Sequence, residues 1–162
     1  MEASVTSKIQ VWWDRFWEIL VIVLLFGIVV LAFTQVIFRY ILNSPLTWSE
    51  AICRYMYVWM VFVGSAVVIN GEGHLTLTFF VDKMPERVQR PLKVVANLIV
   101  IFILFLIFIK EGAYMTNVTS RQISATVGNK MSWIYVAIPV GGVLMVLNTL
   151  RRIVRLLKGQ LQ

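Results

Sequence analysis

The chain has few charged residues and very few of the residues that build reactive or metal-binding sites. Charged side chains make up 14% of its 162 residues, with eight acidic residues, one cysteine and one histidine. The lone Cys53 excludes a disulfide within the chain, and the lone His74 excludes a haem held by two histidines of this chain. With 59% apolar residues, the composition is too apolar for a water-soluble domain and is typical of a membrane protein.

Groups that carry out chemistry are also missing. The sequence has no evident nucleophile paired with a base, no glycine loop for phosphates and no cluster of metal ligands, so it offers no case for an enzyme and no cofactor site. The net charge is +7, but the basic residues flank the apolar runs and form no basic stripe. This pattern argues against nucleic acid as a partner. We therefore expect the chain to support a process that another protein performs.

Long apolar runs dominate what remains. A bilayer core of about 30 Å requires roughly 20 apolar helical residues, and an open sheet cannot satisfy its backbone hydrogen bonds in lipid. The sequence thus predicts an all-α integral membrane protein with four transmembrane helices, packed as one compact domain over 1–162. We place the helices at about 16–38, 48–70, 88–110 and 133–151, with an extension of the third helix to 121 left open.

The basic residues predict the orientation. Ten of the fifteen fall on one side of the four runs, and the positive-inside rule assigns that side, with both termini, to the cytoplasm. The ten inner residues are Lys8, Arg15, Lys83, Arg87, Arg90, Lys93, Arg151, Arg152, Arg155 and Lys158, and the five outer ones are Arg39, Arg54, Lys110, Arg121 and Lys130.

Three charged residues gather where the first two runs meet. Glu50 and Arg54 are four residues apart and share one helix face, while Arg39 ends the first run and can approach them. Thr47 and Glu50 also have the spacing of a capping box, with Thr47 as N-cap. Because charges near the membrane core face protein or a wet cavity, this trio is either a structural ion-pair network or a contact with a partner, lipid or substrate.

The segment between the second and third runs is apolar but too short to span. It follows the turn at 70–74, ends near Asp82, and is predicted to lie in the membrane interface. His74 and Asp82 are assigned to this interfacial turn, since a lone histidine is a weak metal signal.

Small residues and one proline mark the packing of the second and fourth runs. Gly64, Ala66, Gly141 and Gly142 allow helix backbones to approach closely, and Pro139 is expected to kink the fourth helix.

These motifs, in their order and spacing, resemble the small membrane subunit of TRAP (tripartite ATP-independent periplasmic) transporters, of the DctQ type. Ser49 departs from the family pattern, where a second acidic residue is frequent. The resemblance covers nearly the whole chain and is carried by Phe38-Arg39-Tyr40, Pro45-Leu46-Thr47-Trp48-Ser49-Glu50, Arg54, Trp59, Phe62, Gly64, Ala66, Gly73-His74, Asp82, Pro85, Ser132-Trp133-Ile134-Tyr135 and Ile138-Pro139-Val140-Gly141.

The resemblance implies a subunit in the inner (cytoplasmic) membrane of a bacterium or archaeon. It also implies that this subunit braces a large membrane subunit, which itself binds sodium and substrate. It also implies a periplasmic substrate-binding protein that delivers an organic acid such as a dicarboxylate, a sugar acid or sialic acid. The alternative is a membrane anchor of a respiratory or other inner-membrane complex, which the lack of helix-embedded histidine pairs disfavours. A small multidrug exporter ranks last, because the apolar runs lack a mid-membrane acid.

Overall fold

The computed structural model describes residues 2–70 and 86–157. Within these ranges the chain is helical, and its only strand-like pairing is a single antiparallel bridge between Ile123 and Lys130. The elements, in chain order, are α1 (Glu2–Tyr40), α2 (Thr47–Asn70), α4 (Glu86–Leu104), the π-helix η1 (Phe105–Glu111), α5 (Gly112–Val118), the short 3₁₀ turn η2 (Thr119–Arg121), α6 (Ser132–Tyr135) and α7 (Ala137–Leu157).

Four helical stretches in the described residues are long and apolar enough to cross a membrane. Each exceeds the roughly 20 residues that a bilayer core requires, so the predicted all-α, four-helix membrane fold is confirmed. The interfacial segment that we predicted, with His74 and Asp82, lies outside the described residues. The four stretches are Val11–Tyr40, Thr47–Ile69, Pro91–Arg121 and Ser132–Leu156.

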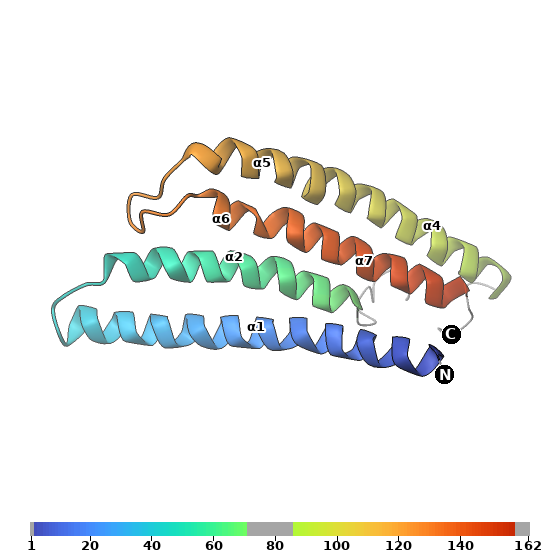
Figure 1. Cartoon of the computed structure of the whole chain (residues 1–162), viewed down its shortest axis with the longest axis horizontal. Helices are drawn as coiled ribbons and strands as arrows, with labels where there is room; N and C mark the ends of the chain where they lie inside the picture. The colour runs from blue at the N-terminus through green and yellow to red at the C-terminus, as the bar shows by residue number, and fades with distance from the viewer. Residues whose placement is uncertain (1, 71–85, 158–162) are drawn as a thin grey trace.

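The helices lie side by side in one layer instead of closing into the compact bundle that the sequence suggested. In the described residues α1 packs on α2, α2 packs on α7 and its outer segment α6, and α7 packs on α4 and η1. Figure 1 shows this order across the layer. The order differs from the chain order because the last helix inserts between the second and third. α1 and α4 are consequently edge helices with wide apolar faces.

Each end of the layer has its own set of connections (Figure 1). We call one end the hairpin end, since it carries the α1–α2 loop and the loop from Gln122 to Met131. Gly128 turns that second loop with a positive φ of 72°, a conformation that glycine adopts without strain. The opposite end, where α1 begins and α7 ends, is called the termini end. The start of α1 and the end of α7 lie at the same end of the layer, as an even number of crossings requires.

The third crossing is continuous from Glu86 to Arg121 but changes its winding midway. Its π-helical segment η1 is followed at once by Gly112, which is buried against α6 and α7. A Cβ built on Gly112 would meet Pro139 Cδ and N at 3.1 Å. A side chain at position 112 would therefore push the third and fourth crossings apart.

The fourth crossing is interrupted between α6 and α7. Pro139 has no N–H to donate to the Tyr135 carbonyl, and the helix breaks at Val136, which still accepts from the Val140 N–H at 3.2 Å. The interruption lies where Pro139 was expected to disturb the helix. α6, which carries Trp133, contacts α2.

α7 is the central helix, and adjacent glycines let it contact neighbours on both sides. A Cβ on Gly141 would lie 2.7 Å from Phe62 Cβ of α2, and one on Gly142 would lie 2.6 Å from Phe108 Cβ of η1. The two phenylalanine rings themselves meet edge to face, 5.9 Å apart. A buried cluster lies beside this contact and consists of Ala66, Leu104, Leu144 and Met145.

Candidate functional site: partner surfaces and polar junctions

The three charged residues predicted at the hairpin end are only partly brought together. Arg54 Nη2 lies 3.0 Å from Glu50 Oε1, so these two form the i,i+4 ion pair expected from their spacing. Their side chains are 67% and 71% exposed. Arg39 is also exposed, and the described residues include no ion pair or hydrogen bond between it and the other two. The pair therefore points out of the layer, where a partner or lipid headgroup can reach it.

Ser49, the departure from the family pattern, is buried at the start of α2. It is 1% exposed, and its hydroxyl donates to the Leu46 carbonyl at 2.8 Å. The helix begins at Thr47, and no described side-chain hydrogen bond from Thr47 or Glu50 closes the predicted capping box. Ser49 thus supplies the local polar contact at this end of the helix.

Two aromatic residues that carried the family resemblance meet across the layer. The Trp59 Nε1–H of α2 donates to the Trp133 carbonyl of α6 at 3.1 Å. They are 74 residues apart in sequence. This bond holds α6 against the middle of α2.

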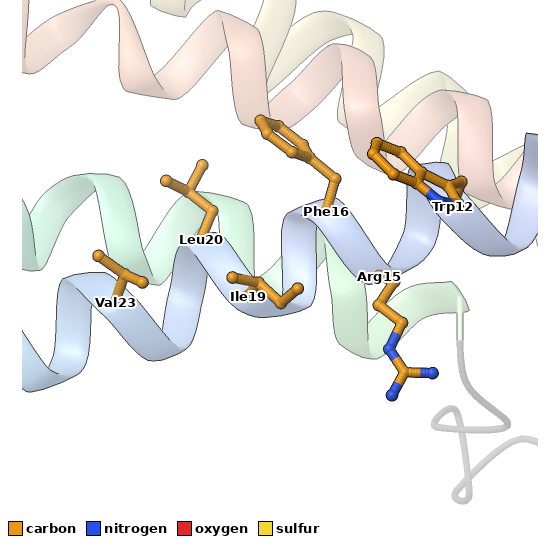
Figure 2. Close-up of a pocket in the computed structure, with 6 residues that line it drawn as sticks. All are labelled: Trp12, Arg15, Phe16, Ile19, Leu20 and Val23. Atoms are coloured by element: carbon orange, nitrogen blue, oxygen red, sulfur yellow. The ribbon is translucent and has the colours of Figure 1, made fainter.

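A large apolar hollow opens on α1 toward the termini end. Figure 2 shows side chains of its lining along successive turns of α1, with the Arg15 guanidinium pointing away from the Trp12 and Phe16 rings. The hollow measures about 400 Å³. Its lining is almost wholly apolar, so it suits an acyl chain or an apolar helix face far better than a polar solute. The lining residues are Trp12, Arg15, Phe16, Ile19, Leu20 and Val23.

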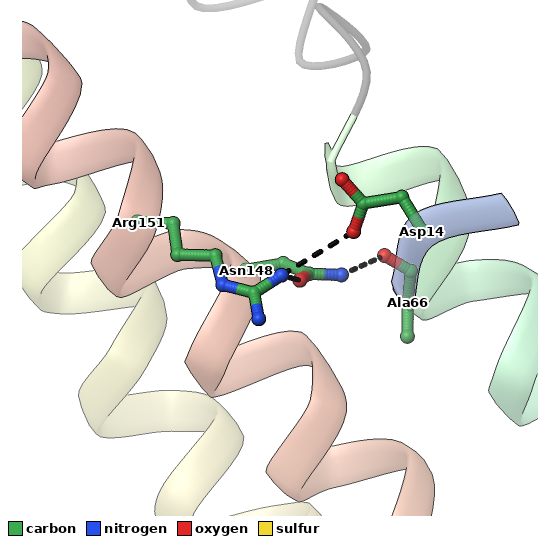
Figure 3. A network of polar contacts seen from close by, with 4 residues as sticks. All are labelled: Asp14, Ala66, Asn148 and Arg151. Atoms are coloured by element: carbon green, nitrogen blue, oxygen red, sulfur yellow. Dashed lines mark hydrogen bonds and ion pairs between the residues drawn. The ribbon is translucent and has the colours of Figure 1, made fainter. Parts of the chain in front are cut away.

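A polar junction joins three helices at the termini end (Figure 3). The Asn148 Nδ2–H of α7 donates to the Ala66 carbonyl of α2 at 2.7 Å, a buried contact. The Arg151 Nη1–H donates to Asp14 Oδ1 of α1 at 3.3 Å and to Asn148 Oδ1 at 3.4 Å. The Arg151 and Asp14 side chains are 27% and 23% exposed, so the ion pair is largely shielded. We call these four residues the three-helix junction.

Sequence reasoning missed this junction. It assigned Arg151 to the orientation signal and gave Asp14 and Asn148 no role. A signal was present, because Asn148 and Arg151 are three apart on one helix face and Asp14 is an acid close to the first apolar run. The sequence did not reveal the order in which the helices pack. That order brings the end of α7 within reach of α1.

The described residues hold no group of three or more histidine, cysteine or acidic side chains arranged for a metal ion. Polar contacts join different helices in the Trp59–Trp133 hydrogen bond and in the three-helix junction, and the widest exposed surfaces are apolar. The fold and these contacts define a multi-pass membrane protein.

The chain belongs to the DctQ component family: a family model described as "Tripartite ATP-independent periplasmic transporters, DctQ component" matches residues 28–159. It is 30% identical over 141 residues to the sialic acid TRAP transporter small permease protein SiaQ of Vibrio cholerae, covering 87% of this chain and 81% of that protein. A putative TRAP transporter small permease protein of Haemophilus influenzae is 30% identical over 144 residues, covering 88% and 86%. The resemblance stated from the sequence motifs is confirmed, and the chain is a TRAP transporter small subunit.

One relative is much longer than this chain. The sialic acid TRAP transporter permease protein SiaT of Haemophilus influenzae is 31% identical over 121 residues, which are 75% of this chain but 19% of that protein. A sequence of this kind therefore occurs as a minor part of a larger permease polypeptide.

Proposed function

We propose that this chain braces a large TRAP membrane subunit, which binds sodium and carries the substrate, while the chain itself transports nothing. The observation that carries this proposal is the match of nearly the whole chain to proteins named small permease proteins. The match to a fifth of a longer permease adds support, because two sequences joined in one polypeptide in a relative are expected to pack together.

The layer architecture suits such a role. A layer one helix thick cannot enclose a translocation path, and its edge helices α1 and α4 expose long apolar faces. In lipid these faces are available to the helices of a larger protein through close packing. Residues that line such faces on the edge helices include Phe26, Phe33, Leu98 and Phe102.

We further propose that a periplasmic substrate-binding protein delivers an organic acid to the complex. Relatives are named for two different acids, sialic acid and C4-dicarboxylate, the latter in a DctQ protein of Vibrio cholerae that is 27% identical over 96 residues. Because small subunits similar to this one are named for both, the choice of acid is assigned to the other components.

We also propose that the chain lies in the inner membrane of a bacterium or archaeon, with both termini in the cytoplasm. The positive-inside bias supports this orientation, and so does the fold, in which the start of α1 and the end of α7 lie at the same end of the layer. Fusion of green fluorescent protein or alkaline phosphatase to the C-terminus tests it. Fluorescence without phosphatase activity is expected, and the reverse pattern would contradict the orientation.

The decisive experiment co-expresses this chain with the large membrane protein encoded beside its gene. A tag on this chain alone should recover both proteins, and sodium-driven uptake in liposomes with the cognate binding protein should require this chain. Purification of this chain alone, with solute transport by it alone, would overturn the proposal. Visible absorbance from a bound haem would instead support the anchor alternative.

We assign Arg39, Glu50 and Arg54 to the contact with the large subunit, a lipid or the binding protein. The outward-facing Glu50–Arg54 pair and the exposed Arg39 support this assignment. Replacing all three with neutral residues should weaken recovery of the complex or uptake. Unchanged assembly and unchanged uptake would exclude the assignment.

A further inference from the structure

A small, partly enclosed space lies beside the three-helix junction. Its volume is about 10 Å³, which is close to the space that one water molecule requires. It lies where α1, α2 and α7 meet, and both apolar and polar side chains bound it. The lining residues are Asp14, Trp17, Glu18, Ala66, Val67, Leu144 and Asn148.

One wall of this space carries a buried donor that no described residue satisfies. The Trp17 Nε1 atom is buried and has no acceptor within the described part of the chain. A buried N–H without a partner loses its hydrogen bond to water without replacement, and native proteins seldom leave one. Trp17 lies about one turn after Asp14 on α1, so its indole and the Asp14 carboxylate share a helix face.

Other lining groups have hydrogen-bonding capacity left over. Arg151 contacts only one of the two Asp14 carboxylate oxygens. Asn148 uses one amide hydrogen on the Ala66 carbonyl, which leaves its second hydrogen for another acceptor. The space is therefore lined by at least two donors and one acceptor that a single small molecule can join.

We propose that one ordered water molecule occupies this space, accepts from the Trp17 indole and the Asn148 amide, and donates to the Asp14 carboxylate. Two to four polar partners are what a buried water requires, and the lining supplies them. A metal ion is a poorer occupant, because the described residues bring no three acidic, histidine or cysteine side chains together. The water completes the three-helix junction as a hydrated polar contact.

The junction matters for α1 in particular. None of the side chains described in α1 is fully buried, and within the described residues its backbone packs closely only on α2. Lipid tails are as apolar as the α1 side chains, so burial of apolar surface does little to fix the rotation of α1 about its axis. The contacts of Asp14 and Trp17 with α7 are directional and supply that constraint.

Nuclear magnetic resonance of the full-length chain in lipid nanodiscs tests the proposal. With ¹⁵N-labelled tryptophan the chain gives indole signals from its six tryptophans, and a Trp17→Phe variant identifies the Trp17 signal. We expect a nuclear Overhauser effect between the Trp17 indole proton and a long-lived water. Trp59 is the matched control, since its indole already donates to a carbonyl and should show no such water contact.

Two variants remove the water in different ways. Asn148→Leu replaces the polar wall, and Val67→Ile fills the space with one added methylene and keeps every polar group. In either variant that folds, the Trp17–water signal should fall to the level of Trp59. Absence of the signal in the wild-type chain, or an unchanged signal in both variants, would overturn the proposal. If neither variant folds, the wild-type spectrum alone decides.

Discussion

At the scale of single residues, glycines decide how closely α7 approaches its neighbours. A Cβ at Gly142 would lie 2.6 Å from Phe108 Cβ, closer than real Cβ contacts, and the obstructing atom belongs to the base of a side chain that cannot swing away. A Cβ at Gly64 would lie 3.8 Å from Val21, an ordinary contact. The same mutation at the two sites should therefore have opposite effects.

We expect Gly142→Ala to lower the free energy of unfolding by about 1–3 kcal/mol through overpacking. The control, Gly64→Ala, should be neutral or stabilising by up to about 1 kcal/mol, because alanine favours the helix. Thermal unfolding of the detergent-solubilised chain, followed by gel filtration, measures both. Equal melting temperatures for the two variants would show that the close approach at Gly142 is absent.

A second prediction at this scale concerns the Asp14–Arg151 ion pair. The side chains are about three-quarters shielded, so reversing one charge should cost more than the 0–1 kcal/mol of an exposed pair, on the order of 2 kcal/mol. Asp14→Arg and Arg151→Asp should each lower the melting temperature, and the double variant should recover much of the loss. Simple additivity of the two losses would mean that the residues do not interact.

At the scale of elements, one proline determines the shape of the fourth crossing. Pro139→Ala restores an N–H opposite the Tyr135 carbonyl, so α6 and α7 should join into one straighter helix. Straightening moves Trp133, and we expect the Trp59–Trp133 hydrogen bond to weaken. Hydrogen exchange should slow across residues 135–140, while the indole proton of Trp59 exchanges faster. Unchanged exchange at both places would argue that Val136 breaks the helix without the proline.

The third crossing is also irregular where it contacts the interrupted part of the fourth crossing. Its π-helical segment precedes Gly112, and that glycine lies against Pro139 at the interruption of the fourth crossing. The π-helical segment of the third crossing therefore lies close to the interruption of the fourth crossing. Because both irregularities lie at one contact, the pair of crossings keeps close packing along its length.

At the scale of the whole molecule, the single layer separates side chains that stabilise the chain from side chains that face outward. Leu104 is buried against α7, while Phe102, two residues earlier, is 63% exposed. Leu104→Ala should destabilise the isolated chain by about 2–4 kcal/mol through the cavity it leaves. Phe102→Ala should leave the isolated chain nearly unchanged, because most of its side chain faces out of the layer.

Comparison of the chain alone with the complex extends this prediction. If the α4 edge is covered by the large subunit, Phe102→Ala should lower the melting temperature only when that subunit is present. Paired thermal unfolding of the two variants, with and without the large subunit, makes the measurement. An equal effect of Phe102→Ala in both samples would place this edge against lipid.

The sequence by itself determined the four membrane-length helices, the all-α class and the family, because the cost of unsatisfied backbone groups in lipid leaves long apolar runs few alternatives. It also determined the local Glu50–Arg54 pair and the break at Pro139, since both depend on residues within one turn of each other.

Only the tertiary structure decided which helices are neighbours. The insertion of α7 between α2 and α4 brought Asn148 to the Ala66 carbonyl and Arg151 to Asp14, and it set Trp59 against Trp133. Helix order in lipid depends on small-residue contacts and single hydrogen bonds between distant positions. An apolar run looks alike on every face in the sequence, so these long-range contacts become visible only once the helices are packed.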